Sequence, residues 1–230
     1  MTKTIGLIGG VSWESTLLYY KLINESTRTN LGGLNSARIL INSLNYAPIV
    51  QLEREDNWPA VTNILTTAAK TLEHAGANFI LLACNTLHKV ADAIESSIKI
   101  PFIHIADPAG ESFQQSNIKT IGLLGTQFTM EETFYTHRLQ SKYNLTVITP
   151  PKHQRKSIDN IIYNELCLGL TKPESKSVLL QAIQTLQSQG AEGILLACTE
   201  LGMLITQQDA TIPVLDTTLL HTEKAISLAL

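Results

Sequence analysis

Short aliphatic runs alternate along the chain with longer segments whose apolar residues recur at helical spacing. Such runs, bounded by glycine and polar residues, are typical of buried parallel strands. They predict strands at residues 3–10, 37–42, 79–83, 102–105, 119–125, 145–148, 193–197 and 213–215. The helical spacing predicts helices at residues 12–29, 58–75, 86–97, 130–143, 157–168, 174–189 and 219–230. Residues 43–57, and the segment with His153, Arg155 and Lys156 that Pro150 opens, are expected to be loops.

Two pairs of these segments are nearly identical in sequence. GANFILLACNT (76–86) and GAEGILLACTE (190–200) share seven of eleven positions, and KTIGLIG (3–9) and KTIGLLG (119–125) share six of seven. The pairs are offset by 114 and 116 residues, which indicates an internal duplication. Together with the alternation of strands and helices, it predicts an α/β fold of two pseudo-symmetric, doubly wound parallel-sheet lobes with the active site between them.

The lobe boundaries follow from the spacing of the repeats. Lobe 1 is expected to cover residues 1–106, and residues 212–230 would join it because the last helix is expected to cross back. Lobe 2 is expected to cover residues 107–211.

Each repeat places a cysteine, Cys84 or Cys198, directly after its aliphatic run. Ligands of open α/β sheets bind at the carboxyl ends of the strands. The Asn or Thr after each cysteine is a good helix N-cap, and a helix N-terminus lowers the pKa of a thiol. For a single cysteine of this kind, packing is favoured by roughly three to one, but the matched pair reverses that preference. For Cys167, which lies outside the repeats, packing in the core remains the favoured interpretation.

Composition narrows the classes of function. The 230 residues are 44% hydrophobic and 16% charged, which supports a folded core. The net charge of −3 gives no indication of a nucleic-acid or anionic-membrane partner. No apolar run approaches the roughly 18 residues of a spanning helix, and the N-terminal residues lack a secretory pattern. We therefore expect a cytoplasmic protein. Three cysteines without Cys-x-x-Cys or His-x-x-x-His spacing predict neither a disulfide framework nor a structural zinc site.

Two equivalent thiols on opposite sides of a cleft suit inversion at a carbon stereocentre. One thiolate would remove a proton, and the other thiol would return one to the opposite face. Because the ordinary pKa of cysteine, about 8.5, is near neutrality, a thiol can serve in both roles. The reverse reaction exchanges the two roles.

The remaining candidates are polar residues just past strand ends. Gly10 ends a double glycine without GxGxxG spacing, which favours backbone N–H groups that approach a carboxylate over nucleotide binding. Glu200 is equally consistent with orienting a thiol or an ammonium group and with favourable charge in a first helical turn. Buried or surface packing is the default for His88 and His104. Helix capping is the default for the other polar residues, which would together offer donors to a substrate: Ser12, Asn85, Thr86, Thr126, Thr129 and Thr199.

Along essentially the whole chain, the sequence resembles the cofactor-independent aspartate/glutamate racemase family. The resemblance is densest in IGLIGGVSWESTLLYYKLIN, LLACNTLHKVADAIE, LLGTQFTMEETFY, IIYNELCLG and LLACTELGMLI. It implies an isomerase of amino-acid metabolism with a two-lobe fold, no pyridoxal phosphate or other cofactor, no metal, and a catalytic pair at Cys84 and Cys198. It also implies that the segment at 51–54, with Glu53 and Arg54, contacts the substrate.

Two positions bear on the substrate that the resemblance implies. Many aspartate racemases have a lysine for the distal carboxylate where this chain has Cys167, so strict aspartate specificity would need Arg54, Arg155 or Lys156 to supply the charge. Some relatives replace the first cysteine by threonine and act in one direction. This chain keeps Cys84, which favours reversible racemisation.

Other functions remain open at this point. Related enzymes isomerise maleate or decarboxylate malonates, although a decarboxylase needs only one essential thiol. A non-catalytic amino-acid sensor is a further alternative, and the lack of Cys-x-x-Cys disfavours a redox protein. As partners we expect an amino-acid substrate, neither nucleic acid nor membrane, and a second copy of the chain, since most soluble oligomers are twofold.

Overall fold

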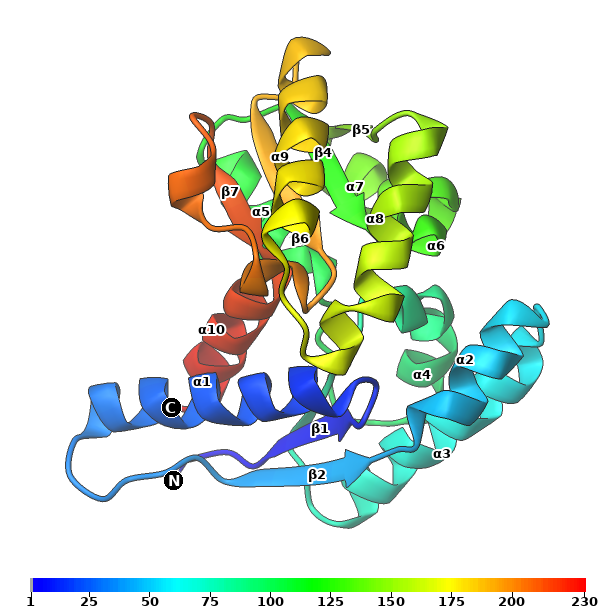
Figure 1. Ribbon diagram of the computed structural model, residues 1–230. Helices are drawn as coiled ribbons and strands as arrows, with labels where there is room; N and C mark the ends of the chain where they lie inside the picture. Colours follow the sequence, from blue (N-terminus) through cyan, green and yellow to red (C-terminus); the bar gives the residue numbers. More distant parts are fainter. Residues whose placement is uncertain (1) are drawn as a thin grey trace. The chain divides into compact units, whose positions relative to one another are not determined.

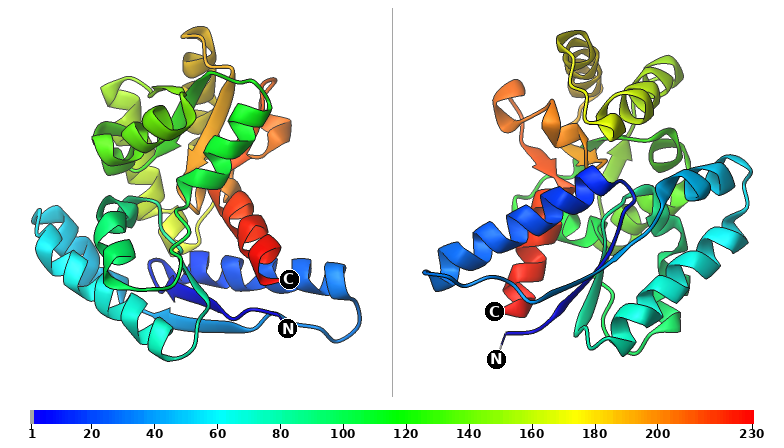
Figure 2. Two further views of the ribbon diagram at one scale, coloured as in Figure 1. Left: turned by 180° about the vertical axis from the view of Figure 1, so that it is seen from behind. Right: turned by 60° about the horizontal axis from the view of Figure 1, so that its bottom comes forward.

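The computed structural model describes residues 2–230, and the chain divides into two compact units (Figures 1 and 2). Unit 1 runs up to His104 and resumes at His221–Leu230, and unit 2 is Ile105–Leu220. Each unit contains one parallel β-sheet with helices on its faces, so the α/β class with two parallel sheets is confirmed. Within residues 2–230, no helix combines the length and the apolar character needed to cross a membrane.

Unit 1 is built on a three-stranded sheet of order β2-β1-β3. Side chains alternate between its two faces: Leu7 packs toward α1 and the end of α10, and Ile8 packs toward the helices after β2 and β3. Figure 2 shows the end of α10 near α1, where the Lys3 N–H donates to the Ala229 carbonyl at 2.9 Å. The elements are β1 (Ile5–Gly9), α1 (Trp13–Leu31), β2 (Ile39–Ser43), α2 (Tyr46–Arg54), α3 (Trp58–His74), β3 (Phe79–Leu82), the 3-10 helix η1 (Thr86–Val90), α4 (Ala91–Ser97) and the second part of α10 (Thr217–Ala229).

Unit 2 is built on a four-stranded sheet of order β5-β4-β6-β7. Leu123 packs toward α5 and α7 on one face, and Leu124 packs toward α8 and α9 on the other. Figure 1 shows α8 and α9 in front of this sheet, with α5 and α7 behind it. The elements are α5 (Ala106–Gln115), β4 (Thr120–Gly125), α6 (Gln127–Glu131), α7 (Thr133–Tyr143), β5 (Thr146–Ile148), α8 (Lys152–Asn164), η2 (Leu166–Leu168), α9 (Pro173–Ser188), β6 (Gly193–Ala197), η3 (Leu201–Met203), η4 (Gln207–Asp209), β7 (Val214–Asp216) and the start of α10.

The duplication seen in the sequence reappears in the strand order of the two sheets. The KTIGL strands, β1 and β4, are central, and the strands that precede the cysteines, β3 and β6, pair with them. The units differ at the next strand, because β7 has only a single bridge, Ile80 to Phe102, as its counterpart in unit 1. The strand expected at 102–105 is therefore wrong. Only two backbone hydrogen bonds form there, and Pro101 lacks the N–H that would extend the pairing.

Three other expectations about the elements are wrong in their bounds or type. The expected loop at 43–57 contains α2, whose start is capped by the Asn45 side chain and which buries Ile49 and Glu53 at helical spacing. The helix expected at 130–143 is two helices, because Glu132 has extended backbone between α6 and α7. The helix expected at 86–97 is likewise divided into η1 and α4.

The segment after Pro150 also differs from the expected loop. It is the first part of α8, which begins at Lys152 after Pro151, so His153, Arg155 and Lys156 are helical. A proline is well tolerated at a helix start because the N–H it lacks would have no partner there. Since α8 ends at Asn164, Cys167 lies in the short η2 rather than in the helix expected at 157–168.

Candidate active site

In unit 1, the candidate residues gather where β1 and β3 end. The register Ile8 to Leu82 brings the turn after β1 beside the segment that carries Cys84, Asn85 and Thr86. Cys84, with 6% of its surface exposed, packs into the core on the α3 side of the sheet. Glu53 and Arg54 lie at the end of α2, the first buried and the second exposed.

The turn after β1 is fixed by local hydrogen bonds. The Gly10 N–H donates to the Thr16 hydroxyl at 2.7 Å, and the side chain of Ser12 caps α1 by accepting from the Ser15 N–H at 3.3 Å. Gly10 has φ +78°, and a Cβ there would collide with the backbone of Leu44. Glycine is thus required by close packing of the backbone, and its N–H serves the start of α1.

The backbone that follows Cys84 differs from the expected helix N-terminus. Asn85 has helical backbone and its side chain does not cap the helix, and η1 is a 3-10 helix of only five residues. Asn85 therefore occupies the predicted N-cap position, but the capping bond expected from its side chain is not formed. Within this segment, His88 Nδ1 lies 2.7 Å from the Cys84 carbonyl oxygen.

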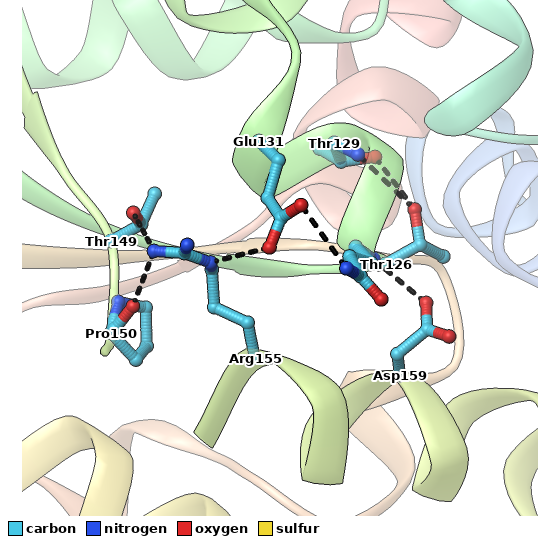
Figure 3. Close-up of polar contacts among 8 residues, drawn as sticks. Thr126, Thr129, Glu131, Thr149, Pro150, Arg155 and Asp159 are labelled. Carbon is cyan, nitrogen blue, oxygen red and sulfur yellow. Dashed lines mark hydrogen bonds and ion pairs between the residues drawn. The ribbon is translucent and has the colours of Figure 1, made fainter. Parts of the chain in front are cut away.

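In unit 2, the candidate residues gather where β4 and β6 end. The register Gly125 to Ala197 places Thr126 beside Cys198 at the carboxyl edge of the sheet. Thr126 caps α6 by accepting from the Thr129 N–H at 3.3 Å, and the two hydroxyl oxygens are 3.1 Å apart (Figure 3). Both threonines are buried. The capping role expected by default is confirmed for Thr126.

Glu200 connects the polar groups around Cys198. The Cys198 thiol donates to Glu200 Oε2 at 3.0 Å, and the Thr199 hydroxyl donates to the same oxygen at 2.8 Å. The Cys167 thiol approaches Oε1 of the same carboxylate at 3.8 Å. Cys167 packs beside the core, as expected, but it also contacts the carboxylate that holds Cys198. Of the two functional roles considered for Glu200, the contacts support orientation of a thiol.

The pKa of Cys198 is shifted in the direction opposite to the expected one. Burial raises it well above its usual range, and the negative charge of Glu200 and the neighbouring Cys167 raise it further. The expected lowering by a helix N-terminus is wrong here, because only the short η3 follows, with a carboxylate at its start. Cys198 is therefore expected to be a protonated thiol at neutral pH.

Asp216, at the end of β7, was missed by the sequence reasoning. Burial raises its pKa to about 6, opposed by hydrogen bonds from Thr218, and Glu200 adds to the increase. An acid that titrates near neutral pH beside the end of β6 can take part in proton exchange. The available signal was its position directly after the run PVL, the same placement that singled out the two cysteines.

The basic residues considered for a substrate carboxylate have different surroundings. Figure 3 shows Arg155 held by Glu131, Thr149 and Pro150, with Nε 2.9 Å from Glu131 Oε1 and Nη1 2.9 Å from the Pro150 carbonyl. The guanidinium is thus already paired within unit 2. Arg54 and Lys156 are exposed. In the part of the chain that the structure describes, no group of three or more His, Cys, Asp or Glu residues is arranged to hold a metal ion.

Comparison with known proteins identifies the family. The profile described as Asp/Glu/Hydantoin racemase matches residues 8–225. A Yersinia pestis structure with an Asp/Glu racemase assignment is 44% identical, with a TM-score of 0.91 and 99% of both chains covered. An aspartate racemase homologue from Pyrococcus horikoshii OT3 is 35% identical, with a TM-score of 0.85 and 99% of both chains covered. The broad specificity amino-acid racemase RacX of Bacillus subtilis (strain 168) is 23% identical over 227 residues, 97% of this chain and 96% of RacX. With its two parallel-sheet units and a cysteine after the corresponding strand of each, the chain belongs to the Asp/Glu/Hydantoin racemase family.

Proposed function

We propose that the protein is an amino-acid racemase that needs no pyridoxal phosphate and uses Cys84 and Cys198 as its two proton-transferring groups. The observation that supports this most is the equivalence of the two cysteines in the two sheets, each after the strand that pairs with the central KTIGL strand. One thiolate removes the α-proton of the substrate, and the other thiol protonates the opposite face of the resulting carbanion. The α-carbon thus loses one proton and gains one, so the substrate and the product have the same composition.

The environment of Cys198 supports its role as the proton donor of the resting enzyme. Its proton lies on the hydrogen bond to Glu200 Oε2, and the raised pKa keeps the thiol protonated. Cys84 then acts as the base in the first half of the cycle. After turnover the protonation states are exchanged, and solvent returns them to the resting state. Glu200 acts on the substrate only through Cys198, so it is a positioning residue.

The proposed substrates are amino acids that include but are not limited to aspartate and glutamate. Arg155 is paired with Glu131, and Cys167 is a neutral side chain beside Glu200. Within unit 2, the side chains around Cys198 thus bring no unpaired guanidinium to a distal carboxylate. A relative named for its broad specificity over amino acids is in keeping with this substrate range.

Isotope exchange tests the proposed activity directly. The purified protein is incubated in D2O, without added pyridoxal phosphate, with each enantiomer of aspartate, glutamate and the other proteinogenic amino acids. Incorporation of α-deuterium together with loss of optical activity is expected for at least one amino acid. Absence of exchange with all of them would contradict the proposal. A variant with both Cys84→Ser and Cys198→Ser is expected to be inactive, and full activity in it would show that the thiols are structural.

A further inference from the structure

Three histidines are buried together in unit 1, although the proposed proton transfers use none of them. His88, His104 and His221 are exposed by 2%, 4% and 0%, respectively. The ring centroids of His88 and His104 are 4.4 Å apart, and those of His88 and His221 are 6.3 Å apart. Histidine is seldom placed in a core without hydrogen-bond partners, because burying unpaired ring nitrogens costs free energy.

One end of this group fixes the place where the chain leaves and re-enters unit 1. His221 Nε2 lies 2.9 Å from the Ile103 carbonyl oxygen, so this nitrogen carries a proton and donates it. Its Nδ1 lies 2.8 Å from the Tyr19 hydroxyl, which donates to it when the ring is neutral. Unit 1 ends at His104 and resumes at His221. The bond between His221 and Ile103 therefore joins the segment where the chain leaves unit 1 to the segment where it returns.

The other end of the group reaches Cys84. His88 Nδ1 is 2.7 Å from the Cys84 carbonyl oxygen and must donate to it, since a carbonyl has no proton. The ring of His88 is held in place by His104 and by Phe102, whose centroid is 5.4 Å away. A series of contacts thus runs from His221, where α10 returns to unit 1, through the histidine rings to the peptide group of Cys84.

We propose that His88 is a positioning residue that fixes the Cys84 peptide, and with it the thiol, through its Nδ1–H hydrogen bond. The proposal rests on the proposed role of Cys84 in catalysis. Reacting groups must be held near their productive geometry, and a displacement of about 1 Å can cost about a hundredfold in rate. The bond lies at the start of η1, a short 3-10 helix whose N-cap residue makes no side-chain capping bond, and it ties the Cys84 peptide to a ring that is itself packed against other rings.

Two substitutions separate the hydrogen bond from the packing of the ring. His88→Asn keeps a donor that can reach a carbonyl four residues earlier, as Asn24 and Asn30 do in this chain at 2.8 Å. His88→Phe keeps an aromatic ring but loses the donor. His74 is a matched control, because its Nδ1 makes the same bond to the Lys70 carbonyl, at 2.7 Å, on an exposed helix end.

The kinetic readout is kcat and KM for racemisation, with thermal unfolding as a check that each variant folds. His88→Phe is expected to lower kcat about a hundredfold with little change in KM, whereas His88→Asn recovers most of the rate and His74→Phe leaves it unchanged. Two results would overturn the proposal: a His88→Phe variant that keeps the native rate, or a loss of rate in His88→Asn equal to that in His88→Phe. In either case the hydrogen bond would not decide the rate.

A second readout is independent of turnover, so it distinguishes failure of this proposal from failure of the proposed function. The rate of Cys84 alkylation by iodoacetamide is followed by mass spectrometry of the peptide that contains it. His88→Phe is expected to raise this rate about tenfold by making local opening easier, and His88→Asn to leave it near the native value. Unchanged alkylation in His88→Phe would overturn the positioning role, whatever the catalytic role of Cys84.

Discussion

The two cysteines follow equivalent strands but have different neighbours. The carbonyl group of Cys84 accepts a hydrogen bond from His88. The buried side chains next to His88 are two further histidines, one of which contacts Tyr19. Cys198 donates to a buried carboxylate, with a second thiol on the same group. Duplication thus explains the position of the thiols, and the substitutions that followed it explain their chemistry. In unit 1 the neighbouring groups fix the backbone, and in unit 2 they hold the proton.

The two units also differ in the polar contacts that stabilise each of them. Unit 2 contains a partly buried charged group in which Asp107, on α5, accepts from Arg138 Nε at 2.6 Å and Nη2 at 2.7 Å, and from Lys142 at 2.7 Å. The corresponding polar contacts of unit 1 are made by Tyr19 and His221. The following predictions test this contrast.

The largest effect on stability is expected from Asp107→Asn, which should lower the free energy of unfolding by about 2 kcal/mol, because Arg138 and Lys142 lose their common partner. Burial raises the pKa of Asp107, but Arg138 and Lys142 lower it by more, so the net shift is downward. Its contribution is therefore present above the ordinary carboxylate pKa and is lost as the pH falls through the folded one. Urea unfolding at neutral pH and near pH 3 measures both effects.

The exposed pair Lys21–Glu25, at 4.0 Å on α1, provides the control for that experiment. Glu25→Gln should change the free energy of unfolding by less than about 0.5 kcal/mol, since exposed ion pairs contribute little. Equal losses in the two variants would show that burial does not distinguish them.

Glu200→Gln should lower kcat about tenfold, because the amide can hold the Cys198 thiol less firmly than the carboxylate. It should also move the pH dependence of Cys198 alkylation to lower pH, since the negative charge that raises the pKa of the thiol is removed. Cys84 alkylation, followed in the same digest, should keep its pH dependence. A shift of both thiols together would contradict the separate environments described above.

The smallest effect is expected from Tyr19→Phe, which removes one hydroxyl and leaves the ring in place. The buried Nδ1 of His221 loses its 2.8 Å partner, so the free energy of unfolding should fall by about 1 kcal/mol. Thermal unfolding measures the change. Tyr20 is the next residue on α1 and is exposed. Tyr20→Phe is therefore the control and should have almost no effect on the free energy of unfolding.

The sheet frame and the position of the thiols could be predicted from the sequence, because buried parallel strands are continuous aliphatic runs and the duplication repeats them. The start of α1 at Ser12 was also predictable from its capping side chain. In contrast, α2 was missed because it buries only one apolar residue completely. A helix that packs with so few apolar side chains leaves a weak periodic pattern.

The chemistry of the thiols was only partly predictable. A helix N-terminus was expected after each cysteine, but both helices are short 3-10 turns, and the pKa of Cys198 depends on burial and on Glu200. The contact of Cys167 with Glu200 joins residues 33 positions apart. The burial of His88 against His104 and His221 likewise depends on where α10 returns. Such long-range contacts have no local sequence signal.

The central claim, that two thiols act on opposite faces of one carbon, is tested most directly by exchange without racemisation. Cys84→Ser and Cys198→Ser are each incubated in D2O with the separate enantiomers of the preferred amino acid, and α-deuterium is measured by NMR. Each variant keeps one thiol, so it should exchange the α-proton of one enantiomer only, and the two variants should select opposite enantiomers. Exchange of the same enantiomer by both variants, or undiminished racemisation by either, would contradict the account.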